Sequence, residues 1–333
     1  MLRRYDPQAE MQVSLANLHR RICCSFSSGI SPTHPTHLMH AQLSRREAIT
    51  TLAGAAALAT LPGLRAAQPQ TAPMPTAPVS SSGFRHSVCK WCYNKIPLDE
   101  FARAAAEIGL HSVELLGPED WPVLKKYGLT CAVANGTTTI PDGFNRLENH
   151  EKQVPTMIER IKACADAGIP SVIVFSGNRA GMSDEQGLEN CVVGVKKIVG
   201  EAEKRGVTIV MELLNSRVNH PDYMCDKTPW GVELVKRVGS ERFKLLYDIY
   251  HMQIMEGDVI RTIRQNAQYI GHYHTAGNPG RHEFEPQDVQ ELNYPAIMRA
   301  IKETGYTGFV GQEFVPSRDP IASLREAIKI CTV

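Results

Sequence analysis

Short apolar runs bounded by turn residues alternate with amphipathic stretches from about residue 84 to the end of the chain. A short continuous apolar run indicates a strand buried on both faces, whereas apolar residues at helical spacing between such runs indicate covering helices. Because the two patterns alternate, the strands should lie parallel in one sheet. The pattern predicts strands at His86–Cys89, Ser112–Leu116, Thr130–Ala134, Ser171–Phe175, Val207–Glu212, Phe243–Asp248, Tyr269–His274 and Gly308–Glu313.

Amphipathic segments between these strands predict helices, and several of them end at a glycine, as at Gly168 and Gly206. A glycine in the left-handed conformation can satisfy the last carbonyls of a helix. The predicted helices are Leu98–Ile108, Val123–Tyr127, Arg146–Ala167, Asp184–Lys204, Pro229–Val238, Val259–Ala267, Tyr294–Glu303 and Pro320–Ile330.

Eight strand and helix pairs over about 250 residues match the size of one (β/α)8 TIM barrel, and we predict this α/β fold. An open doubly wound sheet is the alternative. It gains little support, because no Gly-x-Gly-x-x-Gly motif follows the first strand and no Walker-type lysine loop occurs in the sequence.

The segment before residue 84 carries the features of an export signal. Arg45 and Arg46 precede a short apolar run, Thr51–Leu61, and small residues follow at Ala66 and Ala67. The run is too short to span a membrane, and the paired arginines favour a twin-arginine signal peptide. An ordinary amphipathic or disordered N-terminus is the alternative.

These features predict three segments: an N-terminal extension with the signal peptide over residues 1–67, a Pro/Ser-rich linker over 68–83, and the barrel over 84–333. Translation is predicted to start at Met39, because the preceding residues do not resemble the start of a signal peptide. The mature protein would be exported to the periplasm, with no stable membrane anchor after cleavage. It would be cytoplasmic if the signal does not function.

The charge of the chain argues against nucleic acid as a partner. The 36 basic and 35 acidic residues leave a formal net charge of +1, whereas binding to a phosphate backbone needs a basic surface. The nine cysteines show no repeated zinc-ribbon spacing, and we expect most to be small buried residues. Cys89 and Cys92 form one Cys-x-x-Cys pair, for which a redox or metal role is the minor alternative.

Ionisable residues stand at the ends of the last four predicted strands: Glu212, Asp248, His274 and Glu313. In an α/β barrel, the carboxyl ends of the strands form the rim at which catalytic groups gather. Three carboxylates and one imidazole suit Mn²⁺ or Mg²⁺, with Co²⁺ or Zn²⁺ as substitutes. Each residue alone could instead cap a helix or pack in the core, so the prediction of a divalent metal site depends on their shared placement.

Such a site suits proton transfer on a small α-hydroxy carbonyl compound. A divalent cation can bind the carbonyl and hydroxyl oxygens and stabilise the enediolate that forms when a carbon-bound proton leaves. One carboxylate could take the proton from one carbon and another could return it to the neighbouring carbon. Glu212 and Glu313 are the predicted pair.

Two segments carry specific motifs: Asp248–Gln253 has the sequence Asp-Ile-Tyr-His-Met-Gln, and Asn278–Glu283 has the sequence Asn-Pro-Gly-Arg-His-Glu. Together with residues 211–217, 291–294 and 311–316, they resemble the hydroxypyruvate isomerase family. That family lies within the sugar-phosphate isomerase/epimerase superfamily of xylose isomerase-like TIM barrels. The resemblance extends from about residue 84 to the C-terminus.

The resemblance implies roles for individual residues. Glu212 and Glu313 match the acid/base pair of the family. His251 matches a residue that contacts a substrate oxygen in related ketose epimerases, and Arg281 matches a substrate-binding arginine, a role that suits its planar fork of donors. The alternatives are that His251 only orients a ligand and that Arg281 only braces a loop. Four residues match the metal ligands: Glu212, Asp248, His274 and Glu313.

The implied activity is the isomerisation of hydroxypyruvate to tartronate semialdehyde, with a small hydroxy-keto acid or sugar as partner. Leu213 stands where hydroxypyruvate isomerases typically have proline, and Val218 stands where epimerases have a second acidic residue. The alternatives are an epimerase, or a lyase or hydratase, acting on an exported-compartment keto-sugar, and a non-catalytic sugar-binding barrel. A metal-dependent endonuclease would need more histidines at the rim and a basic groove. Relatives also imply a homo-oligomer formed through the helical shell.

Aromatic residues near the predicted rim have two interpretations. Trp91, Tyr93, Trp121 and Trp230 could line the substrate pocket, but packing in the core or between helices is the commoner role of aromatic residues in this fold.

Overall fold

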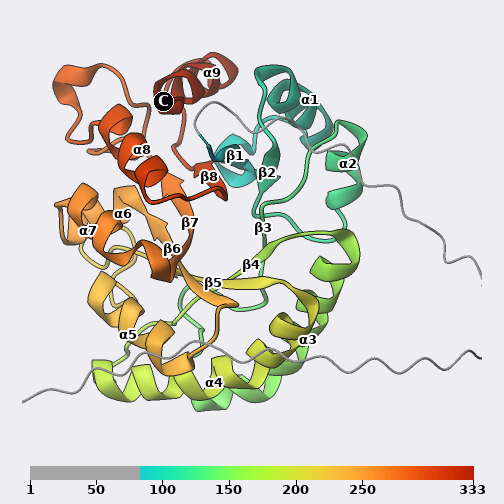
Figure 1. Cartoon of the computed structure of the whole chain (residues 1–333), viewed down its shortest axis with the longest axis vertical. Helices are drawn as coiled ribbons and strands as arrows, with labels where there is room; N and C mark the ends of the chain where they lie inside the picture. The colour runs from blue at the N-terminus through green and yellow to red at the C-terminus, as the bar shows by residue number, and fades with distance from the viewer. Residues whose placement is uncertain (1–82) are drawn as a thin grey trace, which may run out of the picture. The chain divides into compact units, whose positions relative to one another are not determined.

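The computed structural model describes residues 83–333 of the chain. In this part, short parallel strands form the inside of a ring and helices surround them (Figure 1). The strands are β1 (Arg85–Cys89), β2 (Ser112–Glu114), β3 (Val133–Ala134), β4 (Ser171–Val174), β5 (Thr208–Leu213), β6 (Phe243–Asp248), β7 (Ile270–Thr275) and β8 (Phe309–Gln312).

The strands follow the spatial order β2-β1-β8-β7-β6-β5-β4-β3, and each pair of neighbours in this order is parallel. Two isolated bridges, from Ser112 to Thr130 and from Leu116 to Ala134, connect the strands at the two ends of this order. Eight parallel strands therefore form a nearly closed barrel, which confirms the predicted barrel over an open sheet.

Strands β2 and β3 are shorter than the pattern predicts. Leu115 follows β2 with a φ of 59°, in the left-handed region that strands do not adopt. The backbone therefore leaves the ladder at Glu114, and pairing with the β3 region resumes as the isolated bridge at Leu116. The other predicted strands agree with the structure to within one residue at each end.

The predicted helices agree with the structure to within two residues at each end, but one helix was not predicted. Helix α6 begins directly after β6, with no turn residue between, because the Asp248 side chain accepts a hydrogen bond from the His251 backbone N–H and caps the helix. The helices are α1 (Leu98–Ile108), α2 (Trp121–Lys126), α3 (Leu147–Ala167), α4 (Asp184–Arg205), α5 (Thr228–Val238), α6 (Ile249–Met255), α7 (Val259–Asn266), α8 (Tyr294–Glu303) and α9 (Pro320–Cys331), with short 3-10 turns η1 (Lys90–Tyr93), η2 (Ala267–Tyr269) and η3 (Gln287–Val289).

The glycine signals at the helix ends are confirmed. Gly168 after α3 and Gly206 after α4 have φ values of 74° and 72°, and their backbone N–H groups bond to carbonyls of the last helical turn. Only glycine adopts this conformation without strain, so these two residues set where the helices end.

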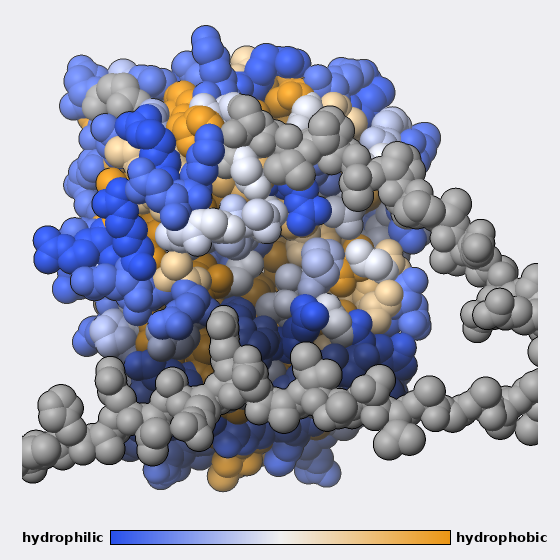
Figure 2. Space-filling model, viewed as in Figure 1, coloured by the Kyte–Doolittle hydropathy of each residue, from blue (hydrophilic) through white to orange (hydrophobic). Residues whose placement is uncertain are grey.

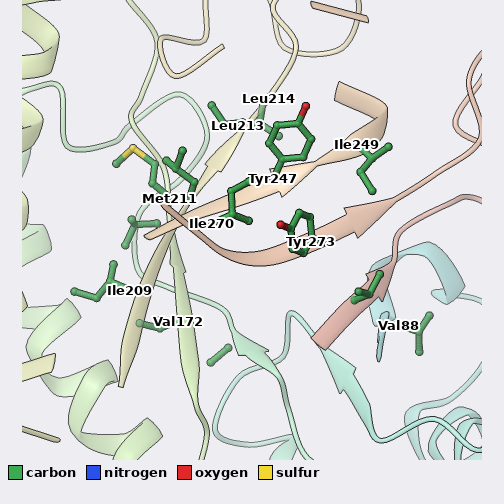
Figure 3. Packing of buried hydrophobic residues seen from close by; sticks show 14 of the residues in the cluster. Val88, Val172, Ile209, Met211, Leu213, Leu214, Tyr247, Ile249, Ile270 and Tyr273 are labelled. Carbon is green, nitrogen blue, oxygen red and sulfur yellow. The ribbon is translucent and has the colours of Figure 1, made fainter. Parts of the chain in front are cut away.

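Alternate residues of the strands pack on two sides of the barrel wall. Figure 3 shows side chains such as Ile209, Met211 and Tyr247, which belong to the large cluster between strands and helices. The intervening residues point into the barrel, where Val210 and Leu246 belong to a separate small buried cluster with Val133 and Ile173. This apolar layer lies beneath the ends of β5 and β6, because Glu212 and Asp248 follow two residues later on the same faces.

Several sequence-based expectations concern residues outside the described part. The signal peptide, the start at Met39 and the linker all lie there, apart from Gly83. Within residues 83–333, no helix is long and apolar enough to cross a membrane. The seven described cysteines are free thiols and six of them are buried, as expected for small core residues. Figure 2 shows hydrophilic residues over most of this face, with hydrophobic residues toward its middle and at a few places on its edge.

Candidate metal centre

The structure brings the four predicted metal ligands together at the carboxyl ends of β5 to β8. Asp248 pairs in register with His274, and His274 pairs with Gly311, two residues before Glu313. Residues at equal positions on neighbouring parallel strands point to the same side, so these side chains converge. One ligand atom from each of Glu212, Asp248, His274 and Glu313 lies within 4.8 Å of all the others.

His274 occupies the middle of this cluster. Its Nδ1 lies 3.2 Å from Glu212 Oε1 and 3.0 Å from Glu313 Oε2. All four side chains are buried. The two glutamates come from β5 and from the end of β8, so they flank the pair formed by Asp248 and His274.

Burial is the largest influence on the pKa values of the three carboxylates. Burial, and then the neighbouring Glu313, raise the pKa of Glu212. Burial raises the pKa of Asp248 well above its usual value, although Arg281 opposes this shift. Burial alone would also raise the pKa of Glu313, but His274 and Arg281 lower it well below the usual range. Like charges this close favour the binding of a cation.

The donor set therefore fits a divalent cation. Asp248 Oδ2 is buried and accepts no hydrogen bond from the described residues. Carboxylate oxygens and one imidazole nitrogen are ligands that Mn²⁺, Mg²⁺ and Zn²⁺ accept in proteins. The described residues thus include a buried group of side chains that could hold a metal ion. The identity of that ion stays a prediction.

His251 lies in α6, next to the cluster, and the direction of its ring is determined by Asn215. The backbone N–H of Asn215 donates to His251 Nδ1 over 3.1 Å. A backbone N–H can only donate, so Nδ1 is the acceptor and the proton of the neutral ring is on Nε2. Burial lowers the pKa of His251 well below its usual value, so the ring is neutral at pH 7. The Nε2–H lies 3.6 Å from Asp248 Oδ2 and has no hydrogen-bond partner among the described residues, so it can donate to a substrate oxygen.

Arg281 reaches the same centre from the loop after β7. Its Nη2 lies 2.7 Å from Glu313 Oε2 and 3.5 Å from Asp248 Oδ2. The guanidinium carbon lies 5.1 Å from the ring centre of Trp91 and 5.3 Å from that of Tyr250. Arg281 thus lies within cation–π distance of two aromatic rings and directs its guanidinium at the carboxylates.

One aromatic residue departs from the packing interpretation. The indole N–H of Trp91 donates to Glu313 Oε1 over 2.8 Å, and 39% of the residue is exposed. Tyr93 stacks on Phe101, and Trp121 is buried in the core, as expected for packing residues. No motif in the sequence marks Trp91, because its contact depends on a strand end far along the chain.

Glu114 and His272 were missed in the sequence. Glu114 ends β2, and His272 stands two residues before His274 on β7. Glu114 Oε1 lies 2.9 Å from His272 Nε2 and 2.7 Å from His274 Nε2. No signal in the sequence marked Glu114, because the predicted strand continued to Leu116 and only the structure ends β2 at Glu114.

Comparison with known proteins gives a consistent assignment. Residues 102–332 match the family model described as xylose isomerase-like TIM barrel. The chain is similar to 2-oxo-tetronate isomerase of Cupriavidus necator, with 32% identity over 243 residues, covering 68% of this chain and 90% of the relative. It is also similar to hydroxypyruvate isomerase of Escherichia coli, with 29% identity, covering 66% of this chain and 89% of the relative.

A solved structure supports the same fold. The crystal structure of a family 2 AP endonuclease from Brucella melitensis superposes with a TM-score of 0.66 and 27% sequence identity, covering 72% of this chain and 97% of that chain.

Proposed function

Because this chain belongs to the xylose isomerase-like TIM barrel family, we propose that it is a divalent-metal-dependent isomerase of small α-hydroxy keto acids. The similarity to hydroxypyruvate and 2-oxo-tetronate isomerases confirms the prediction that it is an isomerase enzyme. Hydroxypyruvate is the substrate that we propose first, with tartronate semialdehyde as the product.

The observation that carries this proposal is the convergence of two carboxylates, one from β5 and one following β8, on a single imidazole nitrogen in a buried centre. Glu212 Oε1 and Glu313 Oε2 both lie within 3.2 Å of His274 Nδ1. A substrate bound over this centre would have one carboxylate near each of two adjacent carbons. This arrangement suits a proton shift between those carbons.

The proposed reaction moves two hydrogens and needs no external oxidant. One glutamate removes a proton from C3 of hydroxypyruvate, and the other delivers a proton to C2. The O3 hydroxyl proton is lost as the C3 aldehyde forms, and O2 gains a proton as the C2 carbonyl becomes a hydroxyl. Glu212 and Glu313 are the proposed acid/base pair, and the Nε2–H of His251 donates to a substrate oxygen.

The proposed cofactor is Mn²⁺ or Mg²⁺, held by Glu212, Asp248, His274 and Glu313. A divalent cation there would stabilise the negative charge that develops on the substrate oxygens. Arg281 would orient the substrate through its planar donors.

A second candidate is proton transfer, by epimerisation or elimination, on a keto-sugar. The exposed part of the Trp91 ring, beside Glu313, favours it, because sugar rings stack on such surfaces.

Export by the twin-arginine route remains part of this proposal, and N-terminal sequencing of secreted material would test it. Nuclease activity is disfavoured, because the cluster of Glu212, Asp248, His274 and Glu313 has one histidine and the chain has a net charge of only +1.

Deuterium uptake tests the proposal. The full chain would be incubated with Mn²⁺ and hydroxypyruvate in D₂O, and mass spectrometry would follow the label. We expect uptake that depends on added metal and that Glu313→Gln reduces by about a thousandfold, since an essential proton-transfer group contributes about 10²- to 10⁴-fold.

Glu119→Gln is the control, because Glu119 is an exposed carboxylate beyond the end of β2. Its uptake should equal that of the wild type. Uptake only with simple ketoses or keto-glycosides would favour the second candidate. No uptake with any of these compounds would contradict both.

A further inference from the structure

A second layer of ionisable side chains lies directly beneath the candidate metal centre. Glu114 and His272 are both buried, and His272 pairs in register with the apolar Leu246 inside the barrel. One carboxylate oxygen, Glu114 Oε1, contacts His272 Nε2 at 2.9 Å and His274 Nε2 at 2.7 Å. The thiol of Cys89 lies 3.7 Å from the same oxygen. The layer shares His274 with the centre above it.

The proton positions follow from this geometry. An ionised carboxylate has no hydrogen to donate, so each imidazole must present an N–H to Glu114. His274 therefore donates its Nε2–H to Glu114, and once the ring is neutral the lone pair of its Nδ1 points toward Glu212 and Glu313. A metal ion needs that lone pair, and the wrong tautomer would block it.

We propose that Glu114 is the positioning carboxylate of the metal centre. It holds His274 through Nε2–H so that Nδ1 faces the other three ligands, and His272 holds Glu114 in place as a second donor. The inference rests on the proposed metal-dependent function. It concerns the orientation of one ligand, His274. The identities of the four ligands and the proposed reaction do not determine that orientation.

The barrel wall leaves space for this contact. Strands β2 and β7 are separated by β1 and β8, so Glu114 must reach His274 past both of these strands. At Gly311 of β8, an added Cβ would lie 2.3 Å from Glu114 Oε1 and 2.9 Å from His274 Cδ2. Any side chain larger than hydrogen would separate the carboxylate from the imidazole.

Stability alone does not explain Glu114. Its Oε2 has no hydrogen-bond partner among the described residues, and the carboxylate is buried. Replacing a buried ionic group with apolar residues is often neutral or stabilising. A buried carboxylate with one unpaired oxygen instead suits a role in orienting a ligand, since groups behind metal-binding histidines contribute about 10- to 100-fold in metal affinity.

Calorimetric titration of the chelator-treated full chain with Mn²⁺ tests the inference. We expect Glu114→Gln to weaken Mn²⁺ binding by about 10- to 100-fold, with one ion per chain in both proteins. Glu283→Gln is the matched control. Glu283 is also a buried carboxylate, but it accepts hydrogen bonds from Ser317 and Ser323. This control should lower the unfolding temperature and leave Mn²⁺ affinity at the wild-type value.

The outcomes are distinguishable. Equal Mn²⁺ affinity in wild type and Glu114→Gln would overturn the inference and leave the proposed function standing. No Mn²⁺ binding by the wild type would overturn both. Two ions per wild-type chain and one in Glu114→Gln would make Glu114 a ligand of a second metal rather than a positioning residue.

A measurement on the wild-type protein keeps the inference testable if the variant does not fold. Imidazole ¹⁵N spectra of the Mg²⁺-loaded, histidine-labelled chain report which ring nitrogen carries the proton. We expect His272 and His274 both to carry it on Nε2. A proton on Nδ1 of His274 would overturn the inference.

Discussion

The two halves of the barrel differ in what their strands carry. Strands β5, β6 and β7 are six residues long and bring Glu212, Asp248 and His274 to the rim, and Glu313 follows β8. Strands β2 and β3 have three and two residues, and the strands β3 and β4 end in apolar residues. The N-terminal half contributes to the centre mainly through Trp91 and Glu114.

The N-terminal half therefore mainly supports the fold, whereas the C-terminal half carries most of the ionisable side chains of the centre. The longest helices, α3 and α4, have 21 and 22 residues and follow the short strands β3 and β4. Burial of their apolar faces stabilises the half that holds few buried charges. The C-terminal half concentrates buried carboxylates, which stabilise nothing by themselves unless they are paired or bind a cation.

Removing a ligand should have the largest effect. Asp248→Ala deletes a carboxylate from the cluster and the capping group of α6. We expect Mn²⁺ affinity to fall by more than about 100-fold, beyond the range of a supporting residue. Calorimetric titration would measure it. The comparison variant is Asn135→Ala, in the loop after β3, which should bind Mn²⁺ like the wild type. Equal losses in both variants would contradict the division between halves.

Filling the space at Gly311 should have the next largest effect. Gly311→Ala places a methyl group against Glu114 and His274, and overpacking of a buried site costs about 1 to 3 kcal/mol. We expect a loss near the top of this range in urea unfolding, together with weaker Mn²⁺ binding. Unchanged stability would show that Glu114 and His274 can move apart at little cost.

The N-terminal half should respond to acid through a buried histidine. Burial, and then the nearby His111, lower the pKa of His86 from 6.5 to about 4. The unfolded chain therefore takes up the proton first as pH falls, so this contribution to stability is complete above about pH 6.5 and is lost between about pH 6.5 and 4. At pH 5 the loss should be about 2 kcal/mol.

Urea unfolding at pH 7.5 and pH 5 would measure this effect. His86→Gln should lose less stability than the wild type over the same pH change, because the substituted side chain does not titrate. Identical pH dependence in both proteins would exclude His86 as the source.

Replacing a glycine in the N-terminal half should have the smallest effect on stability, and it should raise stability rather than lower it. Gly200 lies exposed in α4, and an added Cβ would meet nothing within 4 Å. Gly200→Ala should stabilise the protein by about 0.8 kcal/mol, because alanine loses less conformational freedom in a helix. Thermal unfolding would detect it. Destabilisation would mean that another molecule covers this helix face.

Much of the barrel followed from the sequence because its signals are local. A strand such as Phe243–Asp248, and a helix end such as the one at Gly168, can be predicted from a few neighbouring residues. Helix α6 was missed because it begins directly after Asp248, without a turn signal between strand and helix. Strand β2 was predicted too long, because the left-handed Leu115 has no signal in an otherwise apolar run.

The sequence by itself determined the strand order along the chain and the four ionisable residues at the strand ends, because parallel strands in a barrel present their carboxyl ends at one rim. Only the tertiary structure decided the contacts of Trp91 with Glu313 and of Glu114 with His272 and His274. These partners lie 158 to 222 residues apart. The contacts depend on barrel closure, and the contact of Glu114 with His274 also depends on the small size of Gly311; no local pattern encodes either condition.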